Sequence, residues 1–581
     1  MPARNWLNTL LSVVALAFAL AIVVILFYRV HLGVDFTDES YYVSVTNKLA
    51  RGGSLFVDEM GVGQFAQLCA VPLASLHRTV TESTNGLVLT LRMGYLGFAI
   101  LLSLVTLVAL KRQWGFPAAC VLSLCWVAYA PYNIFAFSYN TVGMQSFGAG
   151  MFCGYYLANS TGSLSPSRYF VVGVLLGVAM TAYPPLALAA PVCVLNLLIV
   201  TRSAAVLLWL GAGCAAVPVA LVCLLGPEGV HYMLRSFASA SAVAPDGAKY
   251  YKVWVNLWEL YKFTAKEWWY FAAVLAIFAV GRIKFAIFRP LPALLLLTLL
   301  PVERSEYHHE NLCVILIAYF AVISIVFLWK QTAARNLFLL VWMPSLVGGY
   351  LTAVSSTNPP GNMAIGIMPG MVASVALLVL LCRTQPDGEA ESSRLCKIVD
   401  SLFHVAIPMT VVIIFAVFSC VSVYRDADPD ELTTRIQQGP FAGLYTTPQR
   451  AAMINDMMAS LHDYSRPDDC VLFIYNFPAG YLLTDMPWAS NDSWGSASYE
   501  TMFRTKVRAI KEYWNDGHRE PTLIVKLNAR WAEYEQKLNY VPGDPYVELL
   551  DRYFSLMSTH PHFAIYRRRT DAPPVLELKV R

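Results

Sequence analysis

The feature that most constrains this chain is a succession of apolar runs, each long enough or nearly long enough to cross a bilayer. Crossing roughly 30 Å of hydrocarbon takes about 20 apolar residues in a helix. About thirteen runs meet or approach that length: 7–28, 87–110, 115–131, 142–159, 168–183, 186–201, 204–225, 268–281, 287–301, 312–329, 336–354, 363–382 and 401–424. Only 14% of the residues are charged, against about 25% in soluble domains. The sequence therefore predicts a mainly α-helical, polytopic membrane protein.

The orientation follows from the basic residues of the short loops. The first apolar run is predicted to be a retained helix, because it is longer than a usual signal-peptide core and lacks a clear small-x-small cleavage site directly before Phe27. Alternate loops on the side of Arg4 carry most of the short-loop cations: Lys111, Arg112, Arg168, Arg202, Arg282, Lys284, Arg289, Lys330, Arg335, Arg383 and Lys397. Since cytoplasmic loops are enriched in Lys and Arg, we expect a cytoplasmic N-terminus and an outer C-terminal part.

Charge and cysteine content exclude two classes of function. The net charge of +4 is spread along the chain without a basic block, so nucleic-acid binding is not expected. The 12 cysteines lie mostly inside apolar runs, and no CxxC pair occurs. Neither a disulfide framework nor a zinc knuckle is indicated.

Two domains are predicted. Residues 1–424 form the transmembrane domain, with a first outer loop at 29–86 and an interfacial loop at 226–267, where Trp254, Trp258 and Tyr261 recur at helical spacing. Such a helix at headgroup depth serves either to anchor the chain or to line a path for a lipid substrate. Residues 425–581 are predicted to be an extracytoplasmic α/β domain, because "CVLFIYN", "TLIVKLN" and "HFAIYRR" read as strands and "TPQRAAMINDMMASLHDYS" as a helix.

An acidic pair, Asp38-Glu39, stands in "VDFTDESYYVSVTNKLARGG", directly after the first apolar run. Thr37 is the expected N-cap of a helix that ends at Gly52-Gly53. Its apolar stripe consists of Tyr42, Val45 and Leu49. Acids in a first turn stabilise a helix by about 0.3–1 kcal/mol, so capping alone accounts for their presence. It does not account for their position at the membrane surface.

An acidic pair followed by aromatic residues and a short helix ending in glycine, directly after the first span, resembles the first outer loop of GT-C glycosyltransferases. Protein O-mannosyltransferases and lipid A aminoarabinose transferases belong to this superfamily. The resemblance covers the topology and residues 35–59. It implies an inverting glycosyltransferase on the outer face of a bacterial cytoplasmic membrane. The sugar donor would be a polyprenyl-phosphate sugar, and the acceptor a cell-envelope glycan, lipid or protein.

A polyprenyl phosphate is already an activated leaving group, so the reaction needs no nucleotide-binding fold. It needs a carboxylate that takes the acceptor's proton during attack on the anomeric carbon. Asp38, held ionised by the helix N-terminus, is the predicted base, with capping or metal binding as its alternatives. Glu39 is its predicted partner in positioning the acceptor or a cation.

A second acidic pair, Asp58-Glu59, follows in "FVDEMGVGQF". It either caps a further surface helix or holds a divalent metal such as Mg or Mn together with Asp38, since oxygen ligands suit these ions. Many relatives carry another acid in the second outer loop, where this chain has Asn140. Asn140 can hydrogen-bond an acceptor but cannot act as a base, and this departure weakens the case for a metal. No cofactor is required by the sequence.

Cations are needed to stabilise the departing phosphate. The predicted outer loop "PVERSEYHHENL" supplies Arg304, His308 and His309, and the forked guanidinium of Arg304 suits phosphate best. Arg92, six residues into the second span, faces a cavity or extends to the surface. His308, His309 and Glu310 could also form a metal cluster, although solvation in a loop is the simpler account of them.

Two other functions remain open on sequence alone. One is a transporter or flippase of lipid-linked sugars, although ionisable residues are sparse within the predicted spans and coupled transporters usually need them there. The other is a non-catalytic membrane scaffold whose outer domain binds a partner. Loss of sugar transfer on replacing Asp38 by Asn distinguishes the transferase from both.

Overall fold

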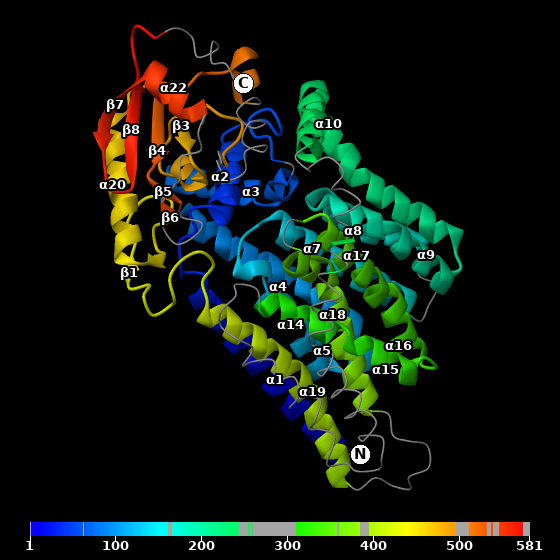
Figure 1. The fold of residues 1–581 in the computed structure, drawn as a ribbon. Helices are drawn as coiled ribbons and strands as arrows, with labels where there is room; N and C mark the ends of the chain where they lie inside the picture. Colours follow the sequence, from blue (N-terminus) through cyan, green and yellow to red (C-terminus); the bar gives the residue numbers. More distant parts are fainter. Residues whose placement is uncertain are drawn as a thin grey trace.

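The computed structural model describes residues 2–242, 254–255, 258, 309–383, 394–494, 510–530, 536–537 and 545–572, apart from residues 62, 161–164 and 357–358. Within these ranges, eight helical stretches are long and apolar enough to cross a membrane. They are Trp6–Arg29, Leu87–Trp114, Pro184–Thr201, Ala204–Phe237, Glu310–Leu328, Thr332–Val354, Gly361–Leu381 and Ser401–Val421. The predicted polytopic, mainly helical fold is therefore confirmed, with a small sheet in the C-terminal part at one end of the bundle (Figure 1).

The helices of the N-terminal region are α1 (Pro2–Arg29), α2 (Asp38–Ala50), η1 (Gln64–Cys69) and α3 (Val71–Thr81). The bundle continues with α4 (Leu87–Trp114), α5 (Phe116–Ser123), α6 (Cys125–Ala128), η2 (Pro131–Asn133), α7 (Tyr139–Ala158), η3 (Pro166–Arg168), α8 (Tyr169–Ala182), η4 (Pro184–Ala189), α9 (Ala190–Thr201) and α10 (Ala204–Ala242). It is completed by α14 (His309–Ala318), α15 (Phe320–Leu328), α16 (Thr332–Leu337), the π-helix η6 (Phe338–Trp342), α17 (Met343–Val354), α18 (Pro359–Arg383) and α19 (Arg394–Val421).

The predicted apolar runs fall on these helices, except 268–281 and 287–301, which lie outside the described residues. The run 204–225 differs in length, because α10 continues to Ala242 after a kink at Gly226, whose φ of 64° favours glycine. The predicted interfacial helix around Trp254 lies almost wholly outside the described residues.

Helix packing within the bundle depends on small residues. Gly173 of α8 faces Gly213 of α10, and a Cβ atom on Gly173 would lie 2.2 Å from the carbonyl oxygen of Leu210. Only glycine permits such a close approach of two helix backbones. Small residues are common at helix contacts in membranes, because the hydrophobic effect does not drive helices together in lipid.

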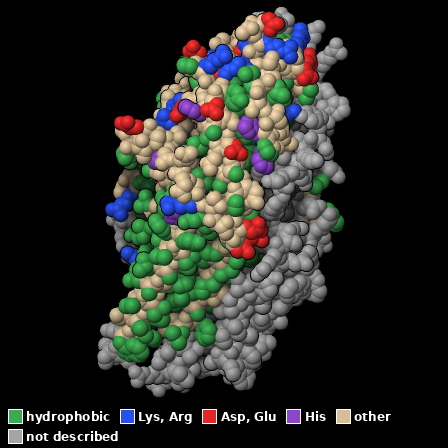
Figure 2. All heavy atoms as spheres, turned by 90° about the vertical axis from the view of Figure 1, so that its left-hand side faces the viewer, with side chains coloured by type: hydrophobic (Ala, Val, Ile, Leu, Met, Phe, Trp, Pro, Cys, Tyr) green, Lys and Arg blue, Asp and Glu red, His purple; other side chains and the backbone are tan. Residues whose placement is uncertain are grey.

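The first and last helices of the bundle, α1 and α19, lie against each other at its outside (Figure 1). Hydrophobic side chains cover the lower part of the face in Figure 2, whereas charged side chains gather towards its upper part. The exposed apolar residues of these two helices include Leu16, Leu20, Val24, Phe27, Leu402, Val417 and Val421. An apolar belt of this kind is what a lipid-facing surface requires.

The C-terminal part contains β1 (Thr434–Arg435), β2 (Tyr445–Thr446), α20 (Pro448–Tyr464), β3 (Val471–Ile474), η7 (Pro478–Leu482), β4 (Leu523–Leu527), β5 (Ala529–Arg530), β6 (Gln536–Lys537), α22 (Pro545–Tyr553), β7 (Phe554–Thr559) and β8 (Phe563–Arg568). Its main sheet has the order β3-β4-β8-β7, in which β3 and β4 are parallel and the other pairs antiparallel. The three predicted strands and the predicted helix are confirmed as β3, β4, β8 and α20. The strand β7 and the helix α22 were not predicted.

Backbone hydrogen bonds join the C-terminal part to the 29–86 segment, which carries α2. Gly33 N donates to the carbonyl oxygen of Tyr445 at 2.8 Å, and Ala479 N donates to that of Phe36 at 3.1 Å. Further along, Met60 N donates to Asn491 at 2.6 Å. The helix α2 therefore lies between the bundle and the C-terminal part, where both can supply partners to its acidic residues (Figure 1).

Candidate functional site

The first turn of α2 is held by Asp35. Its Oδ1 accepts hydrogen bonds from Thr37 N at 2.9 Å and Thr37 Oγ1 at 2.7 Å, and its Oδ2 accepts from Glu39 N at 2.8 Å. Thr37 stands at the predicted N-cap position, but its side chain makes no capping hydrogen bond. Asp35 performs that function, which releases the carboxylates of Asp38 and Glu39 for other contacts.

Glu39 and Arg92 form a buried two-pronged ion pair between α2 and α4. Arg92 Nε lies 2.6 Å from Oε1, and Nη2 lies 2.5 Å from Oε2. The remaining donors of Arg92 bind three carbonyl oxygens at 2.8–3.0 Å, those of Val30, Leu32 and Gly33. All five N–H groups of this guanidinium are thus occupied, so Arg92 has none left for a phosphate.

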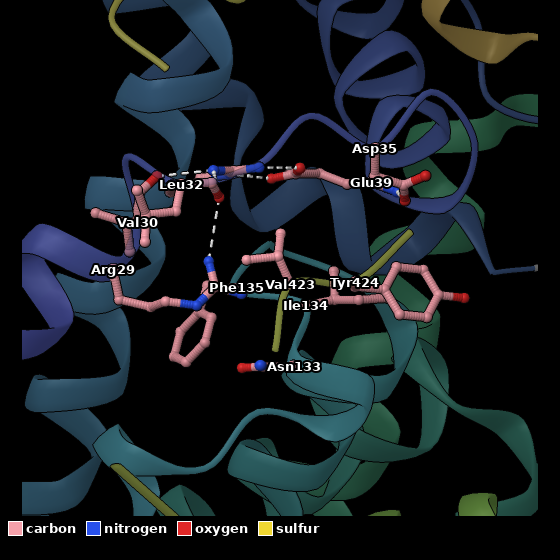
Figure 3. A pocket seen from close by; sticks show the side chains of 11 residues that line it. Arg29, Val30, Leu32, Asp35, Glu39, Asn133, Ile134, Phe135, Val423 and Tyr424 are labelled. Atoms are coloured by element: carbon pink, nitrogen blue, oxygen red, sulfur yellow. Dashed lines mark hydrogen bonds and ion pairs between the residues drawn. The ribbon is translucent and has the colours of Figure 1, made fainter. Parts of the chain in front are cut away.

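A small cavity of about 20 Å³ adjoins this pair (Figure 3). It is lined by Arg29, Asp35, Glu39, Arg92, Asn133 and Tyr424, among others. A volume of this size holds about one water molecule and no sugar. The Glu39–Arg92 pair therefore joins α2 to the bundle at a site that excludes substrate.

Asp38 differs from its neighbour in having one oxygen without a hydrogen-bond donor. Its Oδ2 accepts a hydrogen bond from the Tyr424 hydroxyl and lies 2.8 Å from Arg425 Nη1. No described residue donates to Oδ1, and 17% of the side chain is exposed. Burial raises the pKa of Asp38 to about 6, although Arg425 and the Tyr424 hydrogen bond favour the charged form. At neutral pH the group is thus mostly ionised and can accept a proton.

Arg425 is a second part of this site that the sequence did not reveal. It follows the last span and holds an unusual φ of 51° for a residue other than glycine. Its Nη1 also donates to Thr37 Oγ1 at 2.6 Å, and its guanidinium lies over the Tyr424 ring. Its Nε and Nη2 have no acceptor among the described residues, and 27% of the side chain is exposed. A free carboxylate oxygen and free guanidinium donors therefore lie in one ion pair.

Four tyrosines lie near Asp38, and a fifth stacks on one of them. We call the five the tyrosine wall: Tyr42, Tyr132, Tyr139 and Tyr424, with Tyr183 stacked on Tyr139. Tyr42 and Tyr139 share a hydrogen bond, and the rings of Tyr139 and Tyr183 stack at 5.5 Å. Tyr132 donates to Asn362 Oδ1, and Tyr183 also bonds to that side chain. Ring faces and hydroxyls alternate along such a surface, which suits a sugar because a sugar has both C–H and O–H groups.

The second acidic pair lies against the C-terminal part. Asp58 accepts hydrogen bonds from Ser54 N at 2.6 Å and the Tyr513 hydroxyl at 3.3 Å. Glu59 Oε2 accepts from Ser493 N and Oγ at 3.2 and 2.8 Å, and Oε1 accepts from Gly61 N at 3.2 Å. Burial, with Asp492 nearby, raises the pKa of Glu59 to about 7. Every carboxylate oxygen of this pair has a donor.

A larger cavity of about 400 Å³ lies beside this second pair, between the end of α2 and the C-terminal part. Its lining includes Lys48, Arg51, Asp58, Trp488, His518 and Arg519. Lys48 Nζ donates to the carbonyl oxygen of Asp58 and lies 4.2 Å from the centre of the Trp488 ring. Burial lowers the pKa of Lys48 to about 8.

The other predicted site residues are spread over the structure. Asn140, at the start of α7, is buried, and its Oδ1 has no hydrogen-bond partner within the described part of the chain. Arg304 and His308 lie outside the described residues, and only the backbone of His309 is described, as the first residue of α14. Among the described residues, no three His, Cys, Asp or Glu side chains converge as metal ligands.

Glu310, for which solvation in a loop was the simpler prediction, is instead buried at the start of α14. It is 8% exposed, and no described residue donates a hydrogen bond to its Oε1. The next residue, Asn311, is fully buried; its Nδ2 has no acceptor among the described residues, while its Oδ1 accepts from the Tyr129 hydroxyl at 2.6 Å. An acid at the start of an apolar span was the available signal.

No family model matches the chain, and no curated protein matches it. Five chains among the solved structures match. One is the crystal structure of ArnT from Cupriavidus metallidurans in the apo state, at 15% sequence identity and a TM-score of 0.41. The match covers 99% of this chain and 100% of that one. A likeness of this degree assigns no activity to the present chain.

Proposed function

We propose that the chain is an inverting glycosyltransferase that moves a sugar from a polyprenyl phosphate to a cell-envelope glycan, lipid or protein. The reaction would take place on the outer face of a cytoplasmic membrane, with the N-terminus in the cytoplasm. The single observation that carries the proposal is the free Oδ1 of Asp38, partly exposed beside the tyrosine wall and next to unpaired donors of Arg425.

The chemistry follows from that arrangement. The acceptor hydroxyl attacks the anomeric carbon of the sugar donor, and its proton passes to Asp38 Oδ1. The bond between the anomeric carbon and the phosphate oxygen breaks, and its electron pair leaves with the polyprenyl phosphate. A single attack on the face opposite the leaving group inverts the anomeric configuration. The free N–H groups of Arg425 would stabilise the charge on the departing phosphate.

The roles of the other three acids of the two pairs follow from their contacts. Glu39 would only hold α2 in position against α4, because both of its carboxylate oxygens bind Arg92. Asp58 and Glu59, whose oxygens all have donors, would hold the C-terminal part on the 29–86 segment. The C-terminal part would in turn shape the binding of the acceptor.

The test uses the full-length protein in sealed proteoliposomes with a polyprenyl phosphate that carries a radiolabelled sugar, supplied with envelope extract as a source of acceptors. A transferase converts the labelled lipid to free polyprenyl phosphate and labels an acceptor. A flippase moves the lipid across the bilayer with its sugar bond intact. Movement of the labelled lipid across the bilayer without cleavage of its sugar bond would contradict the proposal. So would a protein that neither cleaves nor moves the lipid with any sugar.

A further inference from the structure

The start of α14 carries two unsatisfied polar groups on consecutive residues. Among the described residues, Glu310 Oε1 has no donor and Asn311 Nδ2 has no acceptor, and the two residues are 8% and 0% exposed. Buried polar groups without partners are rare, since each loses its hydrogen bonds to water without replacement. An acid at the edge of a bundle is costlier still.

These two groups lie close to the candidate site. The helix α14 packs against η2, which carries Tyr132 of the tyrosine wall. Burial and the neighbouring phenols raise the pKa of Tyr132, and the charges of both Glu310 and Asp38 add to this effect. Tyr132 is therefore within electrostatic reach of both carboxylates.

The backbone around Tyr132 is strained in a way that fixes this arrangement. Tyr132 and Asn133 both have positive φ angles, 58° and 59°, in a region that residues other than glycine rarely adopt. Asn133 Nδ2 donates to the carbonyl oxygen of Ser422 at 2.7 Å, beyond the end of α19. Strain of this kind persists where the surroundings hold it, and it is common at binding sites.

We propose that Glu310 and Asn311 bind the sugar of the donor lipid through its hydroxyl groups. A sugar hydroxyl both donates and accepts, so a sugar can complete the unpaired acceptor of Glu310 and the unpaired donor of Asn311. Glu310 begins the apolar stretch Glu310–Leu328 and therefore stands at one end of a candidate membrane span. A sugar joined through phosphate to a membrane-embedded chain would lie at the same level. This inference rests on the proposed function and assigns a sugar subsite to it.

The sharpest prediction concerns stability and binding together. A residue whose role is structural loses stability when it is changed, whereas removal of an unpaired buried acid leaves stability unchanged or raises it. Glu310→Gln should therefore keep or raise the unfolding temperature of the protein, whereas Asn311→Leu should lower it, because the Tyr129 hydroxyl loses its acceptor. Both should weaken binding of the sugar-bearing lipid.

The experiment measures affinities of the full-length protein in detergent for a short-chain polyprenyl phosphate and for the same lipid bearing mannose or arabinose. The wild-type protein should bind at least one of the sugar-bearing lipids about tenfold more tightly than the bare lipid. Glu310→Gln should abolish most of that difference and leave the affinity for the bare lipid unchanged. Glu228→Gln, an exposed acid of α10, is the matched control and should behave as wild type.

The outcomes separate this inference from the proposed function. Equal binding of bare and sugar-bearing lipid by wild type, or a sugar-dependent difference that persists in Glu310→Gln, would overturn the subsite while transfer activity could still be measured. A sugar-dependent difference that persists in Glu310→Gln would mean that water, rather than the sugar, forms the missing hydrogen bonds of Glu310 and Asn311. A fall in unfolding temperature with loss of binding to both lipids would also overturn it, in favour of a structural role. Absence of any lipid binding by wild type would overturn the proposed sugar donor itself.

Discussion

The two acidic pairs of the 29–86 segment look alike in sequence but have different surroundings. In Asp38-Glu39, one acid has both oxygens bound by Arg92 and the other keeps one oxygen without a donor. In Asp58-Glu59, backbone amides, Ser493 and Tyr513 supply a donor to every oxygen. The number of donors around a carboxylate, rather than its position in a motif, therefore distinguishes the acid that we propose to be reactive from the structural ones.

Helix geometry explains the contrast within the first pair. Successive residues of an α-helix point about 100° apart, since one turn takes 3.6 residues. Glu39 is thereby directed towards α4 and Arg92, whereas Asp38 is directed towards the chain that follows α19, with Tyr424 and Arg425. Asp58-Glu59 stands in an irregular segment, where both acids bind the C-terminal part or their own loop.

The largest expected effect concerns the Glu39–Arg92 pair. Glu39→Gln leaves a buried guanidinium without its counter-charge, and such losses cost about 3–5 kcal/mol. The free energy of unfolding, measured with denaturant, should fall by that amount. The exposed pair of Arg51 and Asp485 is the control, since Arg51→Ala should cost only about 0.2–1 kcal/mol. Equal losses at the two pairs would contradict the assignment of Glu39 as a structural acid.

The next effect concerns Arg425. Arg425→Gln should reduce sugar transfer about 100-fold if the guanidinium stabilises the departing phosphate. In wild type, the transfer rate should rise with pH up to about 6, where Asp38 becomes ionised. Arg425 lowers the pKa of Asp38, so its removal should move this rise to higher pH. An unchanged pH profile in Arg425→Gln would show that Arg425 does not affect the ionisation of Asp38, which would contradict this prediction.

A smaller effect is expected for Tyr424→Phe, which removes one hydrogen bond to Asp38 Oδ2 and little else. This hydrogen bond favours the ionised carboxylate, so the variant should show the same upward shift of the pH profile, with a rate loss of about three- to tenfold near neutral pH. Tyr464→Phe, in the C-terminal part, is a control of the same chemistry. A variant as active as wild type at every pH would show that Asp38 needs no such partner.

The last effect concerns Glu59 and is seen in stability rather than in sugar transfer. Burial raises the pKa of Glu59 from 4.5 to about 7, so between these values the folded protein holds a proton that the unfolded chain has lost. The stability of wild type should therefore fall as the pH rises from about 4.5 to 7, with no further contribution above that range. The Glu59→Gln variant should not show this loss of stability between pH 4.5 and 7. Unfolding temperatures measured between pH 5 and 8 test it, with the exposed Glu82→Gln as control.

The local structure was largely predictable because it depends on local patterns. Apolar length identified the spans, and helical spacing together with two glycines set the limits of α2, which ends at Ala50. Buried strands such as β3 and β4 read as short apolar runs. The strand β7 was missed because four of its six residues are exposed, so it lacks that pattern.

The partners of the acids were not predictable, because they come from distant parts of the chain. Glu39 and Arg92 are 53 residues apart, and Asp38 is paired with a residue nearly 400 positions away. Capping by Asp35 in place of Thr37 depends on the turn that precedes α2, which propensity does not specify. The sequence therefore indicated that acidic residues follow the first span. It could not indicate which of their carboxylate oxygens remains without a hydrogen-bond donor.

The central claim is that Asp38 takes the acceptor's proton, and the most direct measurement compares sugar transfer by wild type and Asp38→Asn. Asn keeps the shape of the side chain but cannot act as a base, so the rate should fall by about 10²–10⁴-fold with an unchanged unfolding temperature. Asp430→Asn, at an exposed position beyond the last span, should transfer sugar as wild type does. Transfer by Asp38→Asn within a factor of two of wild type would contradict the claim.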